Sequence, residues 1–186
     1  MIITLSGITG VGKSFFKEQI SKELGIENLV IVTTREKREQ EKEGIDKYFV
    51  TRKQFQDLKK KETIIADFEF LDQYYAYRKQ DMYSNKNQVT ELHYEAIDII
   101  RKYCKNLFAI YIIPMDLVRA EEELKRRKLP KMIEEKRLKE VEKQISQFKN
   151  DEKIREKFDY IFENDYTQES KDKMIEIIKK KIERKI

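Results

Sequence analysis

The segment Gly7-Ile8-Thr9-Gly10-Val11-Gly12-Lys13-Ser14 constrains the fold more than any other part of the chain. It matches the phosphate-loop pattern G-x-x-x-x-G-K-[ST]. An apolar candidate strand at residues 2–5 precedes it, and helical spacing follows at residues 15–24, up to a glycine stop at Gly25. Between a strand and a helix, such glycines let backbone N–H groups point inward at phosphate oxygens. The segment therefore predicts an α/β core that binds a di- or triphosphate.

Lys13 and Ser14 are the residues of this loop that carry chemistry. The Lys13 ammonium is expected to neutralise the β and γ phosphates of ATP, and the Ser14 hydroxyl to bind the Mg²⁺ that accompanies them. The expected ATP-binding set is Gly7, Thr9, Gly10, Val11, Gly12, Lys13, Ser14 and Phe15. Because the chain has a single Cys and a single His, it offers no zinc constellation. The expected cofactors are ATP as co-substrate and Mg²⁺.

Candidate strands alternate with candidate helices along the chain. Apolar, β-branched segments occur at residues 2–5, 29–32, 89–92, 108–113 and 158–162. Helical spacing occurs at residues 15–24, 97–103, 117–128, 138–148 and 171–186. This alternation favours a parallel sheet with helices on both faces. We therefore expect an α/β fold with a five-stranded parallel sheet flanked by helices.

Residues 34–86 interrupt that alternation. They contain a charged loop, a short extended segment, a helix opened by Thr51 and two further strand candidates. Gln54 follows Thr51 by three residues, which is a capping-box pattern. The segment predicts a small, mostly β lobe inserted in a core made of residues 1–33 and 87–186.

Composition limits the class of protein. With 186 residues and 39% hydrophobic content, the chain suits one packed domain. The charge balance of 40 − 35 = +5 is spread over the sequence and does not indicate a nucleic-acid binder. The longest apolar run, residues 107–115, is about half of the ~20 residues that cross a bilayer. The single cysteine, Cys104, suits a reducing compartment, so we expect a cytoplasmic protein with no signal peptide and no membrane or nucleic-acid partner.

The charged loop also carries a family signature. Residues 33–50, TTREKREQEKEGIDKYFV, resemble the pattern T-T-R-x-P-R-x-G-E-x-x-G-x-D-Y-x-F-V of the guanylate kinase family. The matching residues are Thr33, Thr34, Arg35, Arg38, Glu41, Gly44, Asp46, Phe49 and Val50. Similarity continues at Tyr74-Tyr75, Arg127, Lys136-Arg137-Leu138 and residues 158–165, so it covers the whole chain. It implies a single domain, 1–186, with the P-loop kinase fold, an acceptor-binding lobe at 34–86 and a short helical lid at about 126–140.

The resemblance also implies roles for residues of the lobe and the lid. Arg35, Arg38 and Tyr75 stand where the family holds the phosphate of the acceptor nucleotide, and Glu41 would orient those arginines or bind base or ribose indirectly. Arg127 and Arg137 match the lid arginines that close over the transferring phosphoryl group, as catalytic residues beside Lys13. Asp67 and Glu91 complete the implied acceptor-binding set.

The end of the site that would read guanine departs from the family. Ile31, Ala66 and Tyr77 stand where the family has Ser, Glu, and Ser or Thr. Lys47 replaces the tyrosine of D-Y-x-F, and His93 replaces a second acidic residue. Losing polar partners removes discrimination between bases without removing the phosphate chemistry. The sequence therefore leaves guanine specificity open, and for His93 it favours a structural or base-contacting role.

Three functions remain open from the sequence. The leading one is an ATP-dependent nucleoside monophosphate kinase, guanylate kinase-like, which transfers the γ-phosphoryl group to (d)GMP or a related monophosphate. A second is a kinase of another phosphorylated metabolite, such as a different nucleotide or a sugar phosphate. A third is a non-catalytic phosphate-binding module, against which the intact Lys13 and Ser14 argue. The partner is a small-molecule nucleotide acceptor, and the protein is expected to be a monomer or a homodimer.

Overall fold

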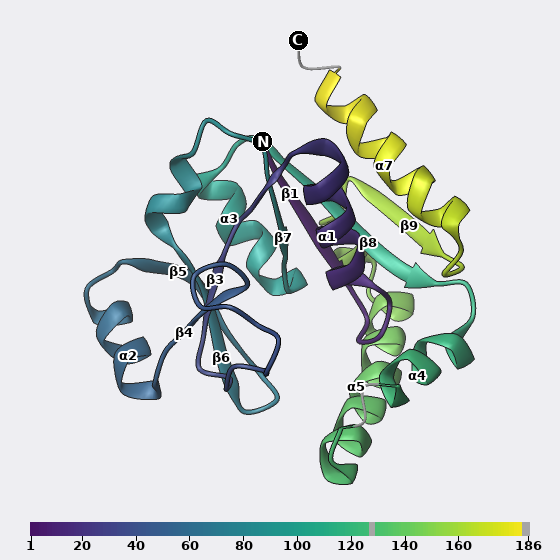
Figure 1. The fold of residues 1–186 in the computed structure, drawn as a ribbon, viewed down its shortest axis with the longest axis horizontal. Helices are drawn as coiled ribbons and strands as arrows, with labels where there is room; N and C mark the ends of the chain where they lie inside the picture. Colours follow the sequence, from purple (N-terminus) through teal and green to yellow (C-terminus); the bar gives the residue numbers. More distant parts are fainter. Residues whose placement is uncertain (127–128, 184–186) are drawn as a thin grey trace.

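The computed structural model describes residues 1–126 and 129–183 and contains a five-stranded parallel sheet. The strands lie in the order β2-β7-β1-β8-β9 (Figure 1). Their bounds are β1 (Ile2–Gly7), β2 (Glu27–Asn28), β7 (Gln88–Glu91), β8 (Leu107–Pro114) and β9 (Tyr160–Asn164). The α/β fold class with a five-stranded parallel sheet is thereby confirmed.

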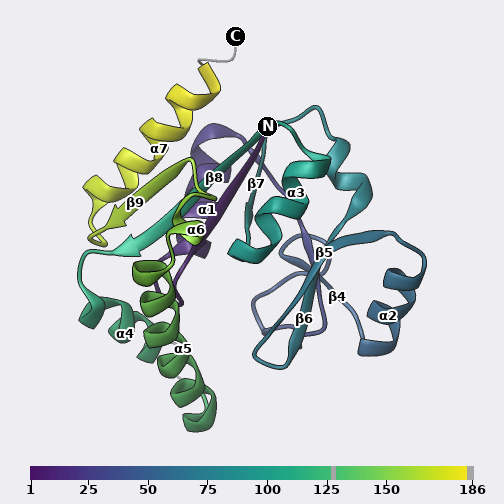
Figure 2. The same ribbon diagram turned by 180° about the vertical axis from the view of Figure 1, so that it is seen from behind.

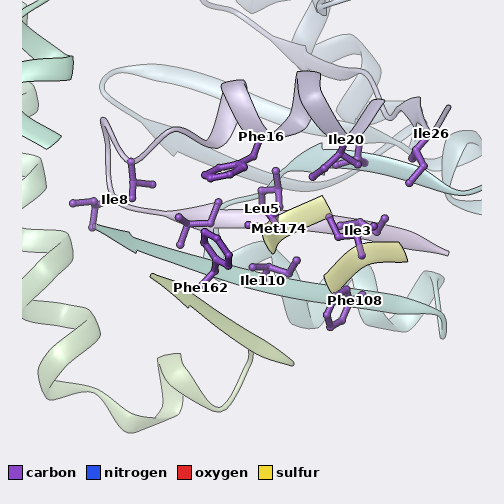
Figure 3. Packing of buried hydrophobic residues seen from close by; sticks show 14 of the residues in the cluster. Ile3, Leu5, Ile8, Phe16, Ile20, Ile26, Phe108, Ile110, Phe162 and Met174 are labelled. Carbon is purple, nitrogen blue, oxygen red and sulfur yellow. The ribbon is translucent and has the colours of Figure 1, made fainter. Parts of the chain in front are cut away.

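Both faces of this sheet are buried, as the alternation of side chains along β8 shows. Phe108, Ile110 and Ile112 pack in one cluster with residues of α1 (Lys13–Leu24) and α7 (Gln168–Glu183) (Figure 3). Leu107 and Ala109 belong to a second cluster with residues of α3 (Ile97–Tyr103). Successive residues of a strand point to opposite faces, so a continuous apolar run marks a strand covered on both sides.

A second sheet forms the inserted lobe, which lies beside the core in both views (Figures 1 and 2). Its strands are β4 (Lys47–Phe49), β3 (Ile31–Thr33), β6 (Gln73–Arg78) and β5 (Ile64–Phe70), in that spatial order. Helix α2 (Arg52–Lys60) begins at Thr51, whose capping box with Gln54 is present as expected. Phe55 of α2 is buried against the sheet with Val32, Ile64 and Ala76.

The strand expected at residues 29–32 is divided between the two sheets. The backbone N–H of Leu29 still donates to the carbonyl of Val89, next to β2 in the main sheet. Two residues later Ile31 pairs with Lys47 and with Tyr77 in the lobe. Because the whole run is buried or half-buried, hydrophobicity alone cannot show where the chain crosses from one sheet to the other.

Three helices, α4, α5 and α6, follow β8 and include most of the residues expected to form the lid. Helix α4 (Leu117–Lys125) begins at Asp116, whose carboxylate accepts from the N–H of Val118. Helix α5 (Lys131–Asn150) follows, then α6 (Glu152–Arg155). The first half of α5 is mostly exposed, whereas its second half buries Val141, Gln144 and Phe148. Two 3₁₀ turns, Lys79–Tyr83 and Tyr94–Ala96, complete the described elements.

Of the helices in residues 1–126 and 129–183, none combines the length and apolar composition needed to cross a bilayer.

Candidate active site

A cavity of about 530 Å³ lies at the carboxyl end of the main sheet, bordered by the phosphate loop, the lobe and α5. The predicted residues that line it are Gly7, Thr9, Gly10, Gly12, Lys13, Ser14, Arg35, Arg38, Glu41, Tyr75, Glu91 and Arg137. The structure thus brings residues from distant parts of the chain to one site. Val11, Phe15 and Asp67 are predicted residues that do not border it, and Arg127 lies outside the described residues.

The phosphate loop has a backbone that only glycine permits at two positions. Gly7 has φ +141, and a Cβ there would lie 2.2 Å from the carbonyl oxygen of Ile112. Gly10 has φ +89, and a Cβ there would lie 2.5 Å from the carbonyl oxygen of Ala120. The loop is therefore pressed against β8 and α4. Within it the Lys13 ammonium donates to the carbonyls of Gly7 at 2.9 Å and Ile8 at 2.7 Å, which holds it over the loop.

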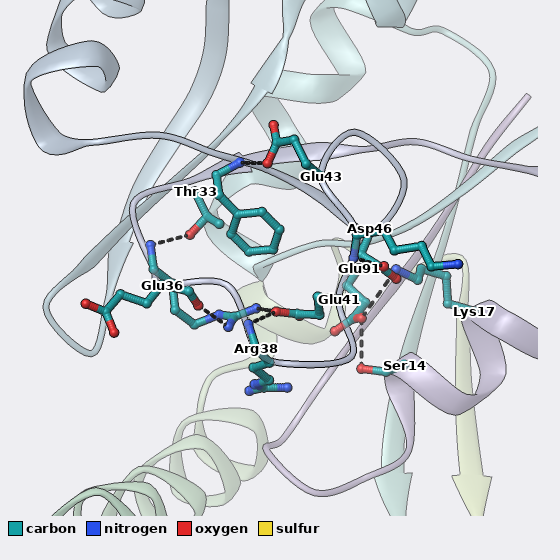
Figure 4. A network of polar contacts seen from close by, with 12 residues as sticks. Ser14, Lys17, Thr33, Glu36, Arg38, Glu41, Glu43, Asp46 and Glu91 are labelled. Carbon is teal, nitrogen blue, oxygen red and sulfur yellow. Dashed lines mark hydrogen bonds and ion pairs between the residues drawn. The ribbon is translucent and has the colours of Figure 1, made fainter.

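Ser14 and Glu91 form the polar centre of the cavity (Figure 4). The Ser14 hydroxyl donates to Glu91 Oε1 at 2.9 Å, and Lys17 Nζ lies 3.9 Å from the same oxygen. Burial raises the pKa of Glu91, but the nearby charges of Lys47, Lys17 and Lys13 outweigh it and hold this pKa at about 2. The carboxylate is therefore ionised at neutral pH. Glu91 was predicted as an acceptor-binding residue, but its carboxylate also lies beside Ser14 of the phosphate loop.

Arg35 and Glu41 make an ion pair at the lobe side of the cavity (Figure 4). Arg35 Nη2 donates to the two Glu41 oxygens at 2.6 and 2.8 Å, and the backbone N–H of Arg38 donates to Glu41 Oε2 at 2.9 Å. Burial opposes ionisation of Glu41, but these hydrogen bonds and charges lower its pKa overall. Both Glu41 oxygens are thus occupied by Arg35 and by the backbone of Arg38.

Three cationic residues that line the cavity, Lys17, Lys22 and Lys47, were not predicted as site residues. Burial lowers the pKa of Lys47, and the charges of Lys17 and Arg35 add to the effect, while Glu91 and Glu41 oppose it. Lys17 could have been found because it follows Ser14 by three residues and shares its helix face. Lys47 could have been found because it occupies the tyrosine position of the family signature.

The other end of the cavity is lined by Ile31, Phe68, Phe70, Tyr75 and His93. The Phe68 ring is stacked between Tyr75 and His93, with centroid distances of 5.3 and 5.2 Å. Burial lowers the pKa of His93, so the imidazole is neutral at pH 7. This end therefore offers flat rings, of which Tyr75 and His93 also carry polar atoms, and one apolar side chain.

The three altered base-reading positions, Ile31, Ala66 and Tyr77, present no hydrogen-bonding group to the cavity. Ile31 is apolar. Tyr77 is buried, and its hydroxyl donates to the backbone carbonyl of Glu91 at 2.6 Å. Ala66 lies in the irregular register between Ile65 and Phe68 and has φ +53. Neither Tyr77 nor Ala66 borders the cavity.

Asp67 lies within the same irregular stretch of β5 and does not face the cavity. Its carboxylate makes an ion pair with Lys59 of α2, on the outer side of the lobe. A register shift re-aims the side chains beside it, so the facing of residues 66–68 does not follow from simple alternation along the strand. Phe68, the next residue, lines the cavity in its place. Asp67 therefore lies outside the cavity.

Arg137 reaches the cavity from α5, and Gln144 of the same helix contacts the phosphate loop directly. The backbone N–H of Thr9 donates to Gln144 Oε1 at 3.0 Å. Gln144 was missed by sequence reasoning. The available signal was its spacing of seven residues from Arg137, which places the two on one helix face.

The donor set of the cavity suits Mg²⁺ better than a softer metal. Ser14 and Glu91 offer a hydroxyl and a carboxylate oxygen within hydrogen-bond distance of each other, and Mg²⁺ prefers oxygen ligands. Within the described ranges, no group of three or more His, Cys, Asp or Glu side chains could hold a metal ion. Ser14 and Glu91 are therefore a pair of described residues that could hold Mg²⁺ beside the phosphate loop.

The guanylate kinase family model matches residues 1–181. The chain belongs to the guanylate kinase family. ATP-dependent phosphorylation of GMP is the function of this family, so the chain is a phosphotransferase of the nucleoside monophosphate kinase type. The predicted family and enzyme class are confirmed.

Individual relatives agree with this assignment. The guanylate kinase of Malacoplasma penetrans is 28% identical over 191 residues, covering 97% of this chain and 93% of the relative. That of Bacillus subtilis is 28% identical over 185 residues, covering 96% and 87%. The crystal structure of guanylate kinase from Anaplasma phagocytophilum superimposes with a TM-score of 0.69 at 26% identity, covering 96% of this chain and 84% of that one.

Proposed function

We propose that this kinase selects its acceptor by the phosphate group and only weakly by the base. It transfers the γ-phosphoryl group of ATP to a phosphate oxygen of (d)GMP or a related monophosphate and releases the diphosphate. The observation that carries the proposal is a cavity with cations at its phosphate end and no polar side chain from its three altered base-reading positions. Every monophosphate offers the same charge to such a site.

At the donor end, Lys13 and the loop backbone bind the triphosphate. The Lys13 ammonium is held by two carbonyl oxygens, and it can exchange these for phosphate oxygens with little movement of the loop. Ser14 and Glu91 would hold Mg²⁺, which supplies neutralisation of charge on the β and γ phosphates. The low pKa of Glu91 keeps its carboxylate ionised for that purpose.

At the acceptor end, Arg35 and Arg38 bind the monophosphate. A guanidinium offers two parallel donors that match phosphate oxygens, and it stays charged at any working pH. Glu41 fixes Arg35 through two hydrogen bonds, so the guanidinium is oriented before the acceptor arrives. Lys47 borders the cavity and adds a cation. Tyr75, whose ring stacks on Phe68 at the base end, would add its hydroxyl.

In the transfer itself, the acceptor oxygen attacks the γ-phosphorus as the bond to the β-γ bridging oxygen breaks. The transition state is loose and its charge is spread over the equatorial oxygens, so catalysis depends on positioning and charge. Lys13 and Arg137 both border the cavity and stabilise that charge. We propose the same role for Arg127. No proton acceptor is required, so His93 acts through stacking at the base end.

Residues 34–86, preceded by β3, act as the acceptor-binding lobe, and residues of about 126–140 act as the lid. We infer a cytoplasmic location from the single cysteine. We propose that the protein is a monomer or a homodimer.

Turnover with a panel of acceptors tests the proposal. ADP formation is measured with ATP and Mg²⁺ in the presence of GMP, dGMP, AMP, CMP, UMP or a sugar phosphate. Several nucleoside monophosphates should be phosphorylated. Turnover with sugar phosphates alone would support a kinase of another metabolite, and no turnover with any acceptor would support a phosphate-binding module.

A further inference from the structure

The hydrogen bond between the Thr9 amide and Gln144 joins two parts of the site that are 135 residues apart in sequence. Both residues are buried, with exposed fractions of 7% for Thr9 and 9% for Gln144. The donor is a backbone N–H, so the atom that faces it must be the amide oxygen of Gln144. The Nε2 group of Gln144 donates to Glu140 Oε1 at 3.2 Å, which holds the side chain in the same orientation.

Gln144 is also the polar member of the three side chains that α5 buries. Val141, one turn before it, packs in the main core cluster with Ile8 and Val11 of the phosphate loop. An apolar side chain at position 144 would fill the space, but it would leave the Thr9 N–H unpaired in the interior, which is costly. The glutamine therefore has a specific partner and does more than pack.

Arg137 lies on the same face of α5 as Gln144. The two are seven residues apart, which is about two helical turns or ~10 Å of rise. Val141 and Gln144 fix the helix to the phosphate loop, and the mostly exposed first half of α5 carries Arg137 to the cavity. A rotation of α5 about its axis would move Arg137 and break the Thr9 contact together.

We propose that Gln144 is a positioning residue that sets the register between the phosphate loop and α5, and so places Arg137 over the transferring phosphoryl group. This inference rests on the proposed catalytic role of Arg137. Gln144 itself is proposed to contact neither substrate. Its effect on the reaction passes through the Thr9 amide and the helix.

The main test is a double-mutant cycle with Gln144→Met and Arg137→Met. Methionine matches glutamine in length but cannot accept the Thr9 hydrogen bond. Because small misplacement of a catalytic group lowers the rate strongly, Gln144→Met should reduce kcat by ~10-fold or more, with the KM for ATP changed by less than ~2-fold. In the Arg137→Met background the same change should cost less than ~2-fold, because the group that it positions is gone.

Two further variants separate positioning from loss of stability. The exchange Glu140→Gln with Gln144→Glu leaves the net charge unchanged and reverses the hydrogen bond between the two side chains. The new carboxylate at position 144 accepts from the Thr9 N–H and from the new amide at position 140. This pair should recover kcat to within ~3-fold of wild type. Gln147→Met places the methionine one turn later, at a residue outside the main cavity, and should leave kcat unchanged.

Hydrogen exchange of the Thr9 amide gives a measurement that needs no nucleotide. Exchange should be ~10-fold faster or more in Gln144→Met. It should be close to wild type in the double variant Glu140→Gln with Gln144→Glu, and in Gln147→Met. Equal losses from Gln144→Met with and without Arg137 would overturn the inference while leaving the proposed function intact. An Arg137→Met variant with wild-type kcat would overturn both the inference and the proposed role of Arg137.

Discussion

The phosphate end and the base end of the cavity are lined by side chains of different chemistry. The phosphate end contains Lys13, Ser14, Arg35 and Arg38, all at the positions that the motifs require, and an ion pair with Glu41 that holds Arg35. The base end contains stacked rings and Ile31. Charge recognises any phosphate, whereas selection among bases needs directional hydrogen bonds. The difference supports the proposal that this kinase keeps its reaction while its acceptor range widens.

The largest effect is expected at the phosphate end, from Lys13→Ala. The ammonium stabilises charge on the β and γ phosphates, and its loss should lower kcat by ~100-fold or more, or ~3 kcal/mol of transition-state stabilisation. The melting temperature should fall by no more than ~5 °C, since the variant loses the two hydrogen bonds from Lys13 to the loop carbonyls and leaves the core unchanged. Turnover and thermal unfolding are measured together. Lys53→Ala, at an exposed site on α2, is the matched control.

More than a tenth of wild-type turnover in a normally folded Lys13→Ala protein would contradict the assignment of the phosphate loop, because that corresponds to less than ~1.4 kcal/mol.

A smaller effect is expected from Arg35→Lys, which keeps the charge and removes the fork. The kcat/KM for the acceptor should fall by ~30- to 100-fold, as for the loss of a charge-assisted hydrogen bond, with the KM for ATP within ~2-fold. Separate Michaelis constants for the two substrates measure this. Arg101→Lys, whose side chain pairs with Asp159 away from the cavity, should change neither. Equal losses for ATP and acceptor would mean that Arg35 does not belong to the acceptor end.

Glu91 lies between the two ends and gives a prediction for stability against pH. Its folded pKa of about 2 lies below the ordinary value of 4.5, so its ionised form stabilises the fold above pH 4.5. That contribution is lost as the pH falls from about 4.5 to about 2. Because 24% of the side chain is exposed, we expect ~2 kcal/mol at neutral pH and not the full ~3 kcal/mol of the pKa difference.

Urea unfolding of wild type and Glu91→Gln at pH 7, 4 and 2.5 measures this contribution. The difference in free energy of unfolding should be largest at pH 7 and shrink toward pH 2.5. The low pKa of Asp165 affects both proteins equally and cancels in the difference. A difference that is constant with pH would show that the cations around Glu91 do not stabilise its ionised form.

At the base end, Tyr77→Phe should change stability and leave selectivity alone. It removes a buried hydrogen bond to the carbonyl of Glu91 and should cost ~1 to 2 kcal/mol of unfolding free energy. Because the hydroxyl is used inside the protein, the ratio of kcat/KM for GMP to that for AMP should stay within ~2-fold. Denaturation and kinetics with both acceptors measure the two effects. A ratio that changed ~10-fold would place Tyr77 in contact with the base.

Much of the fold follows from the sequence because local signals and burial agree. The phosphate loop, the Gly25 helix end and the Thr51 capping box each have a local cause and occur as predicted. The single strand predicted at residues 29–32 is instead divided between the two sheets. The sequence could not show this, because a buried strand has the same composition in either sheet. Hydrogen bonding between strands, and not hydrophobicity, decides where it pairs.

The candidate site was predictable where a motif fixes the spacing and less so where tertiary contacts decide. Arg35, Arg38 and Glu41 lie together as the signature implies. The left-handed backbone of Ala66 and the outward position of Asp67 have no signal in the sequence, because both belong to the irregular register of β5 on β6. The contact of Gln144 with Thr9 spans most of the chain, so helix spacing could suggest the residue and not its partner.

The most direct measurement of the central claim is the set of kcat/KM values for GMP, dGMP, AMP, CMP and UMP at saturating ATP. Each buried hydrogen-bonding group that a base pocket lacks forfeits ~1 to 3 kcal/mol of discrimination, and three positions are altered here. We therefore predict that GMP is preferred over the other bases by less than ~100-fold. A preference of ~10,000-fold or more would contradict the account, because the rings, Glu91 or His93 would then have to read guanine by direct contact.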